Sequence, residues 1–315
     1  MRDSEMAVTR YDSSEISALL RRGENIMRCI RNQEGVQDNS PTAIIYSYDA
    51  QAGSYTKALE NPNIQEHKSQ IGRRLGPLLD DLGPTSLLDA GVGEATSLVP
   101  ILSRMSHPPR EVFGFDISLS RLLYARKHLE GHGIKEAKLF TGELDRIPLS
   151  DSAVDVVITM RAMEPNRGRE ESILKELLRV ARRHLVLIEP SYELGGPATR
   201  DRIEQMGYVS GIPQTLKRLG YAPSRFERWG LDFNSSNEAA LIVVDKAVIA
   251  DVTPPRFVSP ISGKPLVSRA DCWFCPEDGH AFPIIAGIPC LTLASGILAS
   301  KLDQLPSPAD EFDTP

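Results

Sequence analysis

The chain reads Leu87-Leu-Asp-Ala-Gly-Val-Gly-Glu-Ala-Thr96 within its first hundred residues. Apolar residues that end in an acid and run into a turn of small residues predict a buried strand followed by a helix. Gly91 and Gly93 allow a sharp turn and a close approach of the backbone to a ligand. Asp89 falls at the carboxyl end of the predicted strand, where open α/β sheets bind nucleotides. A site that binds a pyrophosphate does not need a carboxylate at this point. Thr96 also stands where the dinucleotide-binding pattern G-x-G-x-x-G has its third glycine, so the stretch argues against binding of a nicotinamide dinucleotide.

Three further segments continue this pattern along the chain. Residues 111–118 read Glu-Val-Phe-Gly-Phe-Asp-Ile-Ser and predict a second strand that ends at Asp116. In a nucleotide-binding βαβ unit, a carboxylate at this point accepts hydrogen bonds from the ribose hydroxyls. Residues 138–144 then place Glu143 and Leu144 after a third strand, and residues 155–160 form a fourth.

Together these segments resemble the motifs of class I S-adenosylmethionine (SAM) methyltransferases, whose first motif is E/D-x-G-x-G-x-G. Ala95 stands at the last glycine of that motif, and Glu143 stands where the family more often has Asp. The resemblance implies that Glu143 reaches the adenine amino group and that Leu144 packs on the adenine ring. The alternative is an ordinary α/β sheet whose strands end in acids. The cofactor-binding residues that the resemblance implies are Asp89, Gly91, Gly93, Asp116, Ile117, Glu143, Leu144 and Met160.

The expected fold class is α/β, with a Rossmann-like seven-stranded methyltransferase sheet covered by helices on both faces. An N-terminal helical lid and a small carboxyl-terminal β-rich domain complete this expectation. Strands are predicted near residues 85–90, 111–116, 136–141, 154–160, 184–189, 222–229 and 239–246. The last two have no clear helix between them, which fits the antiparallel hairpin of methyltransferases. The expected divisions are a lid segment at 1–72, the methyltransferase domain at 73–250, a small domain at 254–295 and a flexible tail at 296–315.

The lid segment is predicted from two features. Apolar residues at helical spacing predict one helix over residues 12–33, and helices are also expected over 68–81 and 171–183. The tyrosines at 46, 48 and 55 either close over the cofactor and shape the substrate pocket, or pack their segment against the sheet.

The expected small domain resembles the Trm112-like family of zinc ribbons. Phe282-Pro-Ile and Gly287-Ile-Pro match its motifs, but its first cysteine pair is replaced by Ser259 and Ser262. Cys275 keeps the third ligand position and Asp278 takes the fourth. Because serine is a poor zinc ligand beside thiolate, zinc is doubtful and we expect no metal site. The alternative ligand set, crowded into nine residues, is Cys272, Cys275, Asp278 and His280.

The chemistry is expected in the loop after the fourth strand. Glu164 is the candidate general base, because a hydroxyl or protonated amine must lose a proton when it accepts a methyl group. Arg161 is the candidate for binding an acidic substrate group or steering the acceptor. The alternative for Glu164 is a loop-bracing acid, and the same holds for Glu189.

Composition narrows the expected partners. The net charge is −6, which lowers the expectation of RNA or DNA binding, since nucleic-acid binders usually carry a basic patch. No signal region or long apolar run is present in the sequence, so we expect a cytoplasmic protein without a membrane partner. The resemblance therefore implies O- or N-methylation of a small-molecule acceptor. An RNA methyltransferase and a catalytically inactive SAM-binding regulatory protein are the alternatives, and a homo-oligomer is left open.

Overall fold

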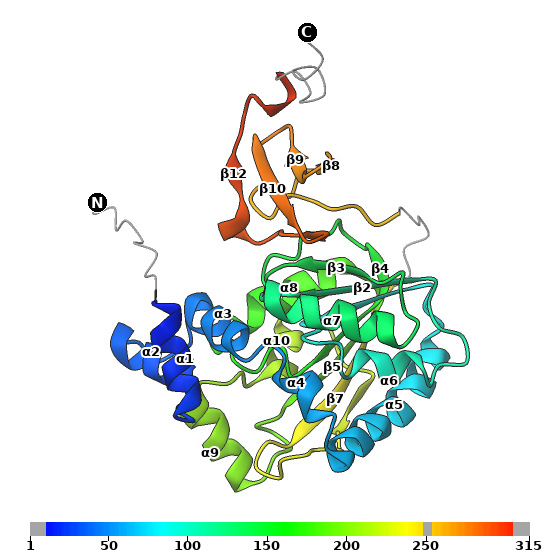
Figure 1. The fold of residues 1–315 in the computed structure, drawn as a ribbon. Helices are drawn as coiled ribbons and strands as arrows, with labels where there is room; N and C mark the ends of the chain where they lie inside the picture. Colours follow the sequence, from blue (N-terminus) through cyan, green and yellow to red (C-terminus); the bar gives the residue numbers. More distant parts are fainter. Residues whose placement is uncertain (1–10, 248–253, 305–315) are drawn as a thin grey trace.

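The structure is a computed structural model, and it describes residues 11–247 and 254–304. Its main body is a seven-stranded sheet with helices on both faces, flanked by short N-terminal helices and by a small antiparallel sheet near the carboxyl end (Figure 1). The expected fold class is therefore confirmed. The helices are α1 (Ser13–Arg21), α2 (Ile26–Glu34), α3 (Pro41–Ala50), α4 (Ser54–Ala58), α5 (Pro62–Leu82), α6 (Leu98–Leu102), α7 (Leu119–Gly131), α8 (Glu170–Val180), α9 (Pro197–Met206) and α10 (Ile212–Arg218).

The large sheet has the strand order β3-β2-β1-β4-β5-β7-β6. All neighbours are parallel except β7, which runs antiparallel to both β5 and β6, as the two late strands of the sequence predicted. The strand order reverses between β1 and β4, and ligands bind outside the carboxyl ends of the strands at such a point. Its strands are β1 (Ser86–Ala90), β2 (Glu111–Asp116), β3 (Lys138–Thr141), β4 (Val154–Met160), β5 (Ala181–Pro190), β6 (Arg225–Arg228) and β7 (Ala239–Asp245).

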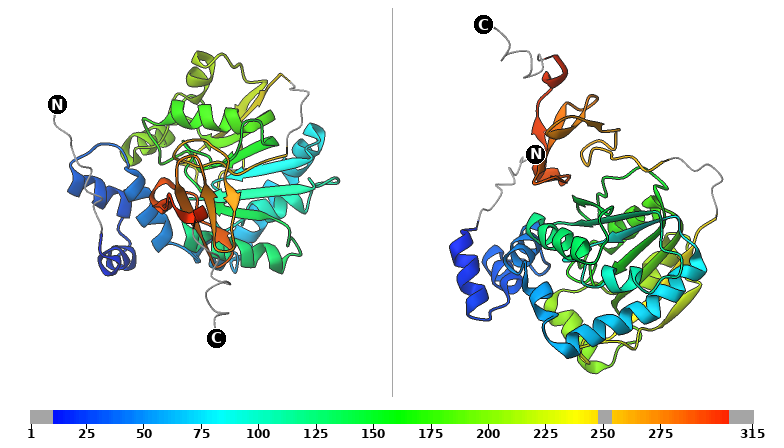
Figure 2. Two further views of the ribbon diagram at one scale, coloured as in Figure 1. Left: turned by 90° about the horizontal axis from the view of Figure 1, so that it is seen from above. Right: turned by 45° about the vertical axis from the view of Figure 1, so that its right-hand side comes forward.

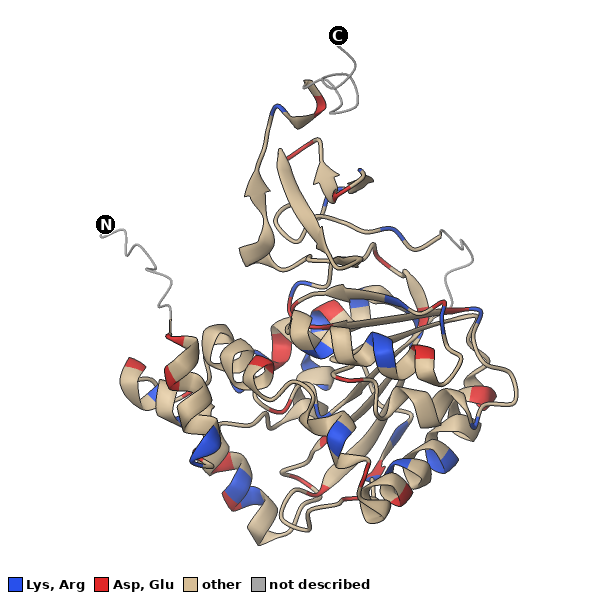
Figure 3. Ribbon diagram, viewed as in Figure 1, with Lys and Arg blue, Asp and Glu red and all other residues tan. Residues whose placement is uncertain are grey.

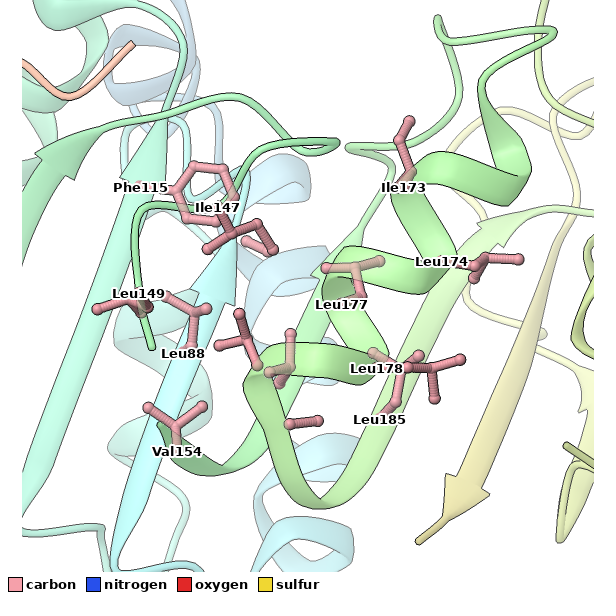
Figure 4. Close-up of a cluster of buried hydrophobic side chains, with 14 of the residues drawn as sticks. Leu88, Phe115, Ile147, Leu149, Val154, Ile173, Leu174, Leu177, Leu178 and Leu185 are labelled. Atoms are coloured by element: carbon pink, nitrogen blue, oxygen red, sulfur yellow. The ribbon is translucent and has the colours of Figure 1, made fainter. Parts of the chain in front are cut away.

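The core of the main body lies on the two faces of this sheet. Helix α8 turns one apolar side, which includes Leu174 and Leu177, toward Leu88 on β1 and Leu185 on β5 (Figure 4). Helices α5, α6 and α7 cover the opposite face with a second buried cluster. Because both faces are covered, β1 is buried along its whole length, which explains its nearly continuous apolar sequence.

Two predicted helices have different bounds in the structure. The expected helix over residues 12–33 is two helices, because the chain turns at Gly23 with a φ of +71° and restarts after Asn25. The Asn25 side chain accepts a hydrogen bond from the amide of Arg28 and so caps the second helix. The expected helix over 171–183 ends at Val180, because Ala181 already begins strand β5.

The expected division at residues 72 and 73 falls inside α5, which runs without a break from Pro62 to Leu82. The expected tail at 296–315 also needs correction over its described part. Strand β12 (Ile297–Leu298) pairs with β10, and the amide of Ala299 donates to the carbonyl of Gly279 at 2.8 Å. These backbone hydrogen bonds hold residues 297–299 on the small sheet. Residues 305–315 lie outside the described part of the chain.

The small sheet follows residue 254 and stands at the β3 side of the main body (Figures 1 and 2). We call residues 254–304 the C-terminal module. Its strands, which pair in the order β11-β10-β9-β8 with β12 also on β10, are β8 (Val267–Ser268), β9 (Cys272–Cys275), β10 (His280–Ile285), β11 (Ile288–Pro289) and β12.

The C-terminal module packs on the edge of the large sheet. Cys290 forms a parallel bridge with Thr141 of β3, and the amide of Leu291 donates to the Thr141 carbonyl at 3.2 Å and to its hydroxyl at 2.9 Å. The Phe257 ring lies 5.1 Å from the Phe140 ring. Phe282 of β10 belongs to the same buried cluster as Phe140, so the module and the main body share one hydrophobic core.

Candidate functional site

A cavity of about 390 Å³ opens at the carboxyl ends of β1, β2 and β4. Its wall combines the glycine turn after β1, the ends of β2 and β4, the loop after β3, and residues of α3, α4 and α5. All but one of the expected cofactor residues contribute to this wall. They are Gly91, Gly93, Asp116, Ile117, Glu143, Leu144 and Met160.

The two glycines of the first motif are needed for backbone shape and close packing. Gly91 has a φ of +85°, and a Cβ at this position would lie only 2.3 Å from the Cβ of Ala162 in the loop after β4. Gly93 has a φ of +56° and keeps the floor of the cavity free of a side chain. Ala95 replaces the last glycine of the motif, yet its φ is +57°, so the turn keeps its shape at the cost of strain on an L-residue.

Asp116 ends β2 and is held by backbone donors. Its two carboxylate oxygens accept from the amides of Gly93 at 3.1 Å and Ser118 at 2.9 Å. Burial raises the pKa of Asp116, and the charge of Arg121 and the two amides partly offset that effect. Each oxygen keeps a free lone pair, which is what two ribose hydroxyls need.

Asp89 is the expected cofactor residue that the cavity wall does not include. It is buried at the end of β1, and burial together with the charge of Asp116 raises its pKa to about 7. Lys68 of α5 is the cation that opposes this rise. The Lys68 ammonium lines the cavity and donates to the Ser97 hydroxyl at 2.8 Å, while burial and Arg161 lower its pKa to about 8.

The loop after β3 carries Glu143 and Leu144 into the cavity wall. Burial and the neighbouring charge of Asp145 raise the pKa of Glu143, and the amide of Leu293 in the C-terminal module partly offsets this rise. The module therefore lies next to the loop that is expected to contact adenine.

The N-terminal helices make hydrogen bonds to two of the segments that are expected to bind the cofactor, the glycine turn and the end of β2. Glu94, inside the glycine turn, accepts hydrogen bonds from the amides of Gly53 at 2.9 Å and Thr56 at 2.7 Å and from the Thr56 hydroxyl at 2.8 Å. These donors lie at the first turn of α4. Next to Asp116, the Ser118 hydroxyl donates to Asp49 of α3 at 2.6 Å. We call these contacts of Glu94 and of Asp49 the lid contacts.

The three tyrosines of this segment divide into two groups. Tyr48 and Tyr55 line the cavity, and the guanidinium of Arg121 lies between their rings at 4.8 and 4.3 Å from the ring centroids. Tyr46 instead packs edge-on against Tyr11 at 5.5 Å. Of the two alternatives for this segment, the pocket interpretation therefore fits Tyr48 and Tyr55, and the packing interpretation fits Tyr46.

Arg161 and Glu164 lie side by side in the loop after β4 and both line the cavity. The Arg161 Nη2 atom donates to Asp232 at 2.6 Å and to the Asn237 carbonyl at 3.0 Å. Its Nη1 atom is buried without a hydrogen-bond partner in the described part of the chain and lies 3.9 Å from Glu164 Oε2. Burial raises the pKa of Glu164, although Arg161 and the Asn237 amide, at 3.3 Å, act against that rise.

Glu189 fits the loop-bracing alternative. Its Oε1 atom accepts from the amides of Ala162 at 3.0 Å and Met163 at 3.2 Å, at the start of the loop that carries Glu164. Burial and the charge of Glu164 raise the pKa of Glu189 to about 8. The carboxyl group is therefore mostly protonated at neutral pH.

The four ligand positions of the ribbon motif converge in the C-terminal module. The hydroxyls of Ser259 and Ser262 donate to the same Asp278 oxygen at 2.6 and 2.5 Å, and Ser262 Oγ lies 3.9 Å from Cys275 Sγ. Burial alone would raise the pKa of Asp278, but the two serine hydrogen bonds lower it overall. Across residues 11–247 and 254–304, no three His, Cys, Asp or Glu side chains are grouped so that they could hold a metal ion. The alternative set that includes Cys272 and His280 is thus not brought together.

Some of the residues that line the cavity were not predicted as site residues from the sequence, among them Lys68, Glu94 and Arg121. Glu94 lies inside the first motif, so its position was a usable signal. Lys68 and Arg121 lie on helices where a charged residue ordinarily points to solvent, and their sequence positions gave no such signal.

The comparisons with known proteins agree with this geometry. Residues 87–184 match a family described as methyltransferase domain. The magnesium protoporphyrin IX methyltransferase from Synechocystis PCC 6803, solved with bound SAH, is 15% identical with a TM-score of 0.52, covering 66% of this chain and 100% of that one. A SAM-dependent methyltransferase from Aquifex aeolicus is 20% identical with a TM-score of 0.43, covering 62% of this chain and 98% of that one.

At this identity the Synechocystis enzyme shows that the two proteins share a fold. The family match adds that the segment from β1 to the start of β5 has the sequence pattern of methyltransferases. No helix in the described residues has the length and apolar character needed to span a membrane. The chain thus carries a methyltransferase domain over residues 87–184, in a fold that it shares with the Synechocystis enzyme.

Proposed function

We propose that the protein methylates an oxygen or nitrogen atom of a small-molecule acceptor and that the cavity binds both SAM and this acceptor. The observation that carries the proposal is the placement of Glu164 in the same cavity as the expected cofactor residues. SAM supplies an activated methyl group when it is bound, so the main task of the protein is to align the acceptor and exclude water.

The residues at the β1, β2 and β3 ends fit SAM. Asp116 retains acceptor capacity for the ribose, Glu143 and Leu144 border the place for adenine, and the bare backbone of Gly93 leaves room between them. Lys68, which lines the cavity, supplies a cation for the carboxylate of the methionine part, and Asp89, buried outside the cavity wall, stabilises the charge of Lys68. Met160 and Ile117 add apolar walls to the cavity.

Glu164 is the proposed general base. Its raised pKa makes it a better proton acceptor than an ordinary carboxylate, and its position on the cavity wall gives it access to an acceptor. Arg161 is proposed to steer the acceptor through Nη1, because Nη2 is committed to Asp232.

The remaining segments are proposed to have roles other than methyl transfer itself. We propose that residues 1–72 act as a lid and that residues 254–295 are a Trm112-like domain fused to the methyltransferase domain at 73–250. The cluster of Ser259, Ser262, Cys275 and Asp278 supports this identification, because four ligand positions of a ribbon converge there. The domain is proposed to be structural and independent of zinc.

Calorimetry and an acceptor screen test the proposal. Asp116→Ala should weaken SAH binding by roughly 1–3 kcal/mol, since a charged acceptor is lost. With an acceptor identified from a panel of hydroxyl and amine compounds, Glu164→Gln should slow turnover by about 10²–10⁴-fold and leave SAH affinity nearly unchanged. The exposed Glu136→Gln is the matched control.

Three outcomes would contradict the proposal. Undiminished turnover in the Glu164→Gln variant would remove Glu164 as base. Methylation of RNA in the same screen, with no small-molecule product, would favour the RNA enzyme. SAH binding without any methyl transfer across both panels would favour an inactive regulatory protein.

A further inference from the structure

Arg121 is a buried cation that the proposed cofactor site does not use. It lies near the start of α7, directly after β2, and is 6% exposed. Its Nε and Nη2 atoms are buried and have no hydrogen-bond partner in the part of the chain that the structure describes. A buried donor without a partner costs about 1–3 kcal/mol, and more on a charged group, so such atoms point to a ligand.

The nearby acids do not satisfy this guanidinium. The oxygens of Glu94 already accept hydrogen bonds from α4, and the ion pair between Arg121 Nε and Glu94 is long at 4.0 Å. Asp116 stabilises the charge of Arg121, but neither Nε nor Nη2 of Arg121 makes a hydrogen bond to it.

The shape of the cavity leaves space beside Arg121. Arg121 lines the cavity next to Gly93, which has no side chain. A Cβ added to Gly93 would lie 3.6 Å from the Arg121 Nη1 atom, so the bare glycine backbone leaves this position open. The rings of Tyr48 and Tyr55 both contact the guanidinium, with their centroids 4.8 and 4.3 Å from its central carbon, and so limit its movement. A planar guanidinium fixed in this way is suited to bidentate binding of a carboxylate or phosphate.

Tyr48 connects this position to the proposed base. Its ring lies next to the Arg121 guanidinium, and burial, followed by the charge of Glu164, raises the Tyr48 pKa. Because Tyr48, Arg121 and Glu164 all line the cavity, an acceptor bound there beside Tyr48 would lie near both Arg121 and Glu164.

We propose that the methyl acceptor carries an oxyanion, a carboxylate or a phosphate, and that Arg121 binds this group between Tyr48 and Tyr55 while the reacting atom lies near Glu164. The proposal rests on the proposed function, because it concerns the acceptor half of the same cavity. Lys68, which donates to the Ser97 hydroxyl, is left for the cofactor.

The experiment uses the full-length protein saturated with SAH and measures binding of matched probes by calorimetry. Benzoate is compared with benzamide, and phenyl phosphate and inorganic phosphate form a second arm. We expect at least one oxyanion probe to bind about tenfold tighter than benzamide, and Arg121→Met to remove this preference. SAH affinity should change less than about threefold in that variant. Lys127→Met on the exposed side of α7 is the matched charge control.

The two arms identify the oxyanion, since tight benzoate binding indicates a carboxylate and tight phenyl phosphate binding a phosphate. Equal affinity of the wild-type complex for benzamide and for every oxyanion probe would overturn the proposal, and this comparison needs no variant.

A tenfold loss of SAH affinity in Arg121→Met with unchanged probe binding would also overturn it, because Arg121 would then serve the cofactor. If Arg121→Met fails to fold, Arg121→Lys takes its place and should keep part of the preference for oxyanion probes. A lysine variant that keeps the full preference would count against a bidentate contact from Arg121. Absence of SAH binding by the wild-type protein would instead refute the proposed function, whereas Arg121-dependent benzoate binding would still support the subsite.

Discussion

Glu189 illustrates how single buried residues shape the active-site loop. It is 1% exposed, and its carboxyl group holds the amides of Ala162 and Met163. A buried ionised carboxylate would be costly here, because Glu164 lies nearby with the same charge. The neutral acid avoids that cost and still accepts both hydrogen bonds.

Glu189→Gln should therefore be nearly neutral at pH 4, where the acid is protonated in both the folded and the unfolded chain and an amide resembles it. The folded-state pKa of about 8 lies above the ordinary value of 4.5, so the stability that Glu189 contributes is complete below about pH 4.5 and is lost as the pH rises from there through about 8. The glutamine variant does not titrate and keeps its stability over this range. Urea unfolding should give equal free energies of unfolding at pH 4 and a more stable variant at pH 9.

Glu136→Gln, on an exposed loop, should show no such crossing. A variant that is less stable than the natural protein at pH 9 by more than about 2 kcal/mol would mean that the ionised Glu189 is stabilised in the folded protein, which contradicts the raised pKa.

At the scale of elements, the lid contacts tie the N-terminal helices to the glycine turn. Helix α4 has five residues and no side-chain cap of its own, so Glu94 of the core supplies the acceptor for its first turn. The same carboxylate lies in the glycine turn that we propose to bind the cofactor. The position of the N-terminal helices and the shape of this turn are therefore coupled through one side chain.

Glu94→Ala should release α4 from the turn. Three backbone amides and one hydroxyl lose their acceptor, which should cost roughly 1–3 kcal/mol of unfolding free energy. Hydrogen exchange should rise over residues 44–58 and stay unchanged in β4 and β5. The exposed Glu60→Ala is the control, and unchanged protection over 44–58 would argue against the coupling.

The C-terminal module offers a second test at this scale. Its four ligand positions converge, but oxygen replaces sulfur at three of them, and zinc in such sites relies on sulfur or imidazole. The protein purified without chelator should contain far less than one zinc per chain by elemental analysis. The triple variant Ser259→Cys, Ser262→Cys and Asp278→Cys should gain one zinc, because thiolates in a tetrahedral site lie about 3.8 Å apart, similar to the 3.9 Å between Ser262 Oγ and Cys275 Sγ.

Cys272→Ser is the control for that variant, since Cys272 lies outside the cluster. Stoichiometric zinc in the natural protein, lost together with stability on adding a chelator, would show that the module depends on metal.

At the scale of the whole molecule, charge and core packing distinguish surface from interior. Basic and acidic residues are interspersed along the helices in the view of Figure 3. The apolar cluster, in contrast, continues from α8 through β3 into the C-terminal module. One core that spans both parts predicts that they unfold together.

Phe282→Ala tests this shared core. The ring is fully buried, and its removal should lower the free energy of unfolding by roughly 3–5 kcal/mol. Calorimetry should show a single transition at a lower temperature in the variant. Leu298→Ala, at a position that is 71% exposed, should leave the transition nearly unchanged. Two separate transitions in the natural protein would contradict a shared core.

The sequence by itself determined the strands, the glycine turn and the acids at the strand ends. These features depend on local patterns, since a buried parallel strand needs a continuous apolar run and a sharp turn needs glycine. Local patterns were less reliable where one residue decides an element boundary. Gly23 divides the expected N-terminal helix, and Ala181 begins β5 rather than ending α8.

Only the tertiary structure decided which distant residues meet. The bonds from Glu94 to α4, the rings of Tyr48 and Tyr55 around Arg121, the pair of Arg161 with Asp232, and the docking of Leu291 on Thr141 all join residues far apart in the chain. No periodicity predicts such contacts, because each depends on how whole elements pack around the sheet. The sequence therefore determines where the proposed cofactor motifs lie, and the packing of the N-terminal helices and the C-terminal module decides what surrounds them.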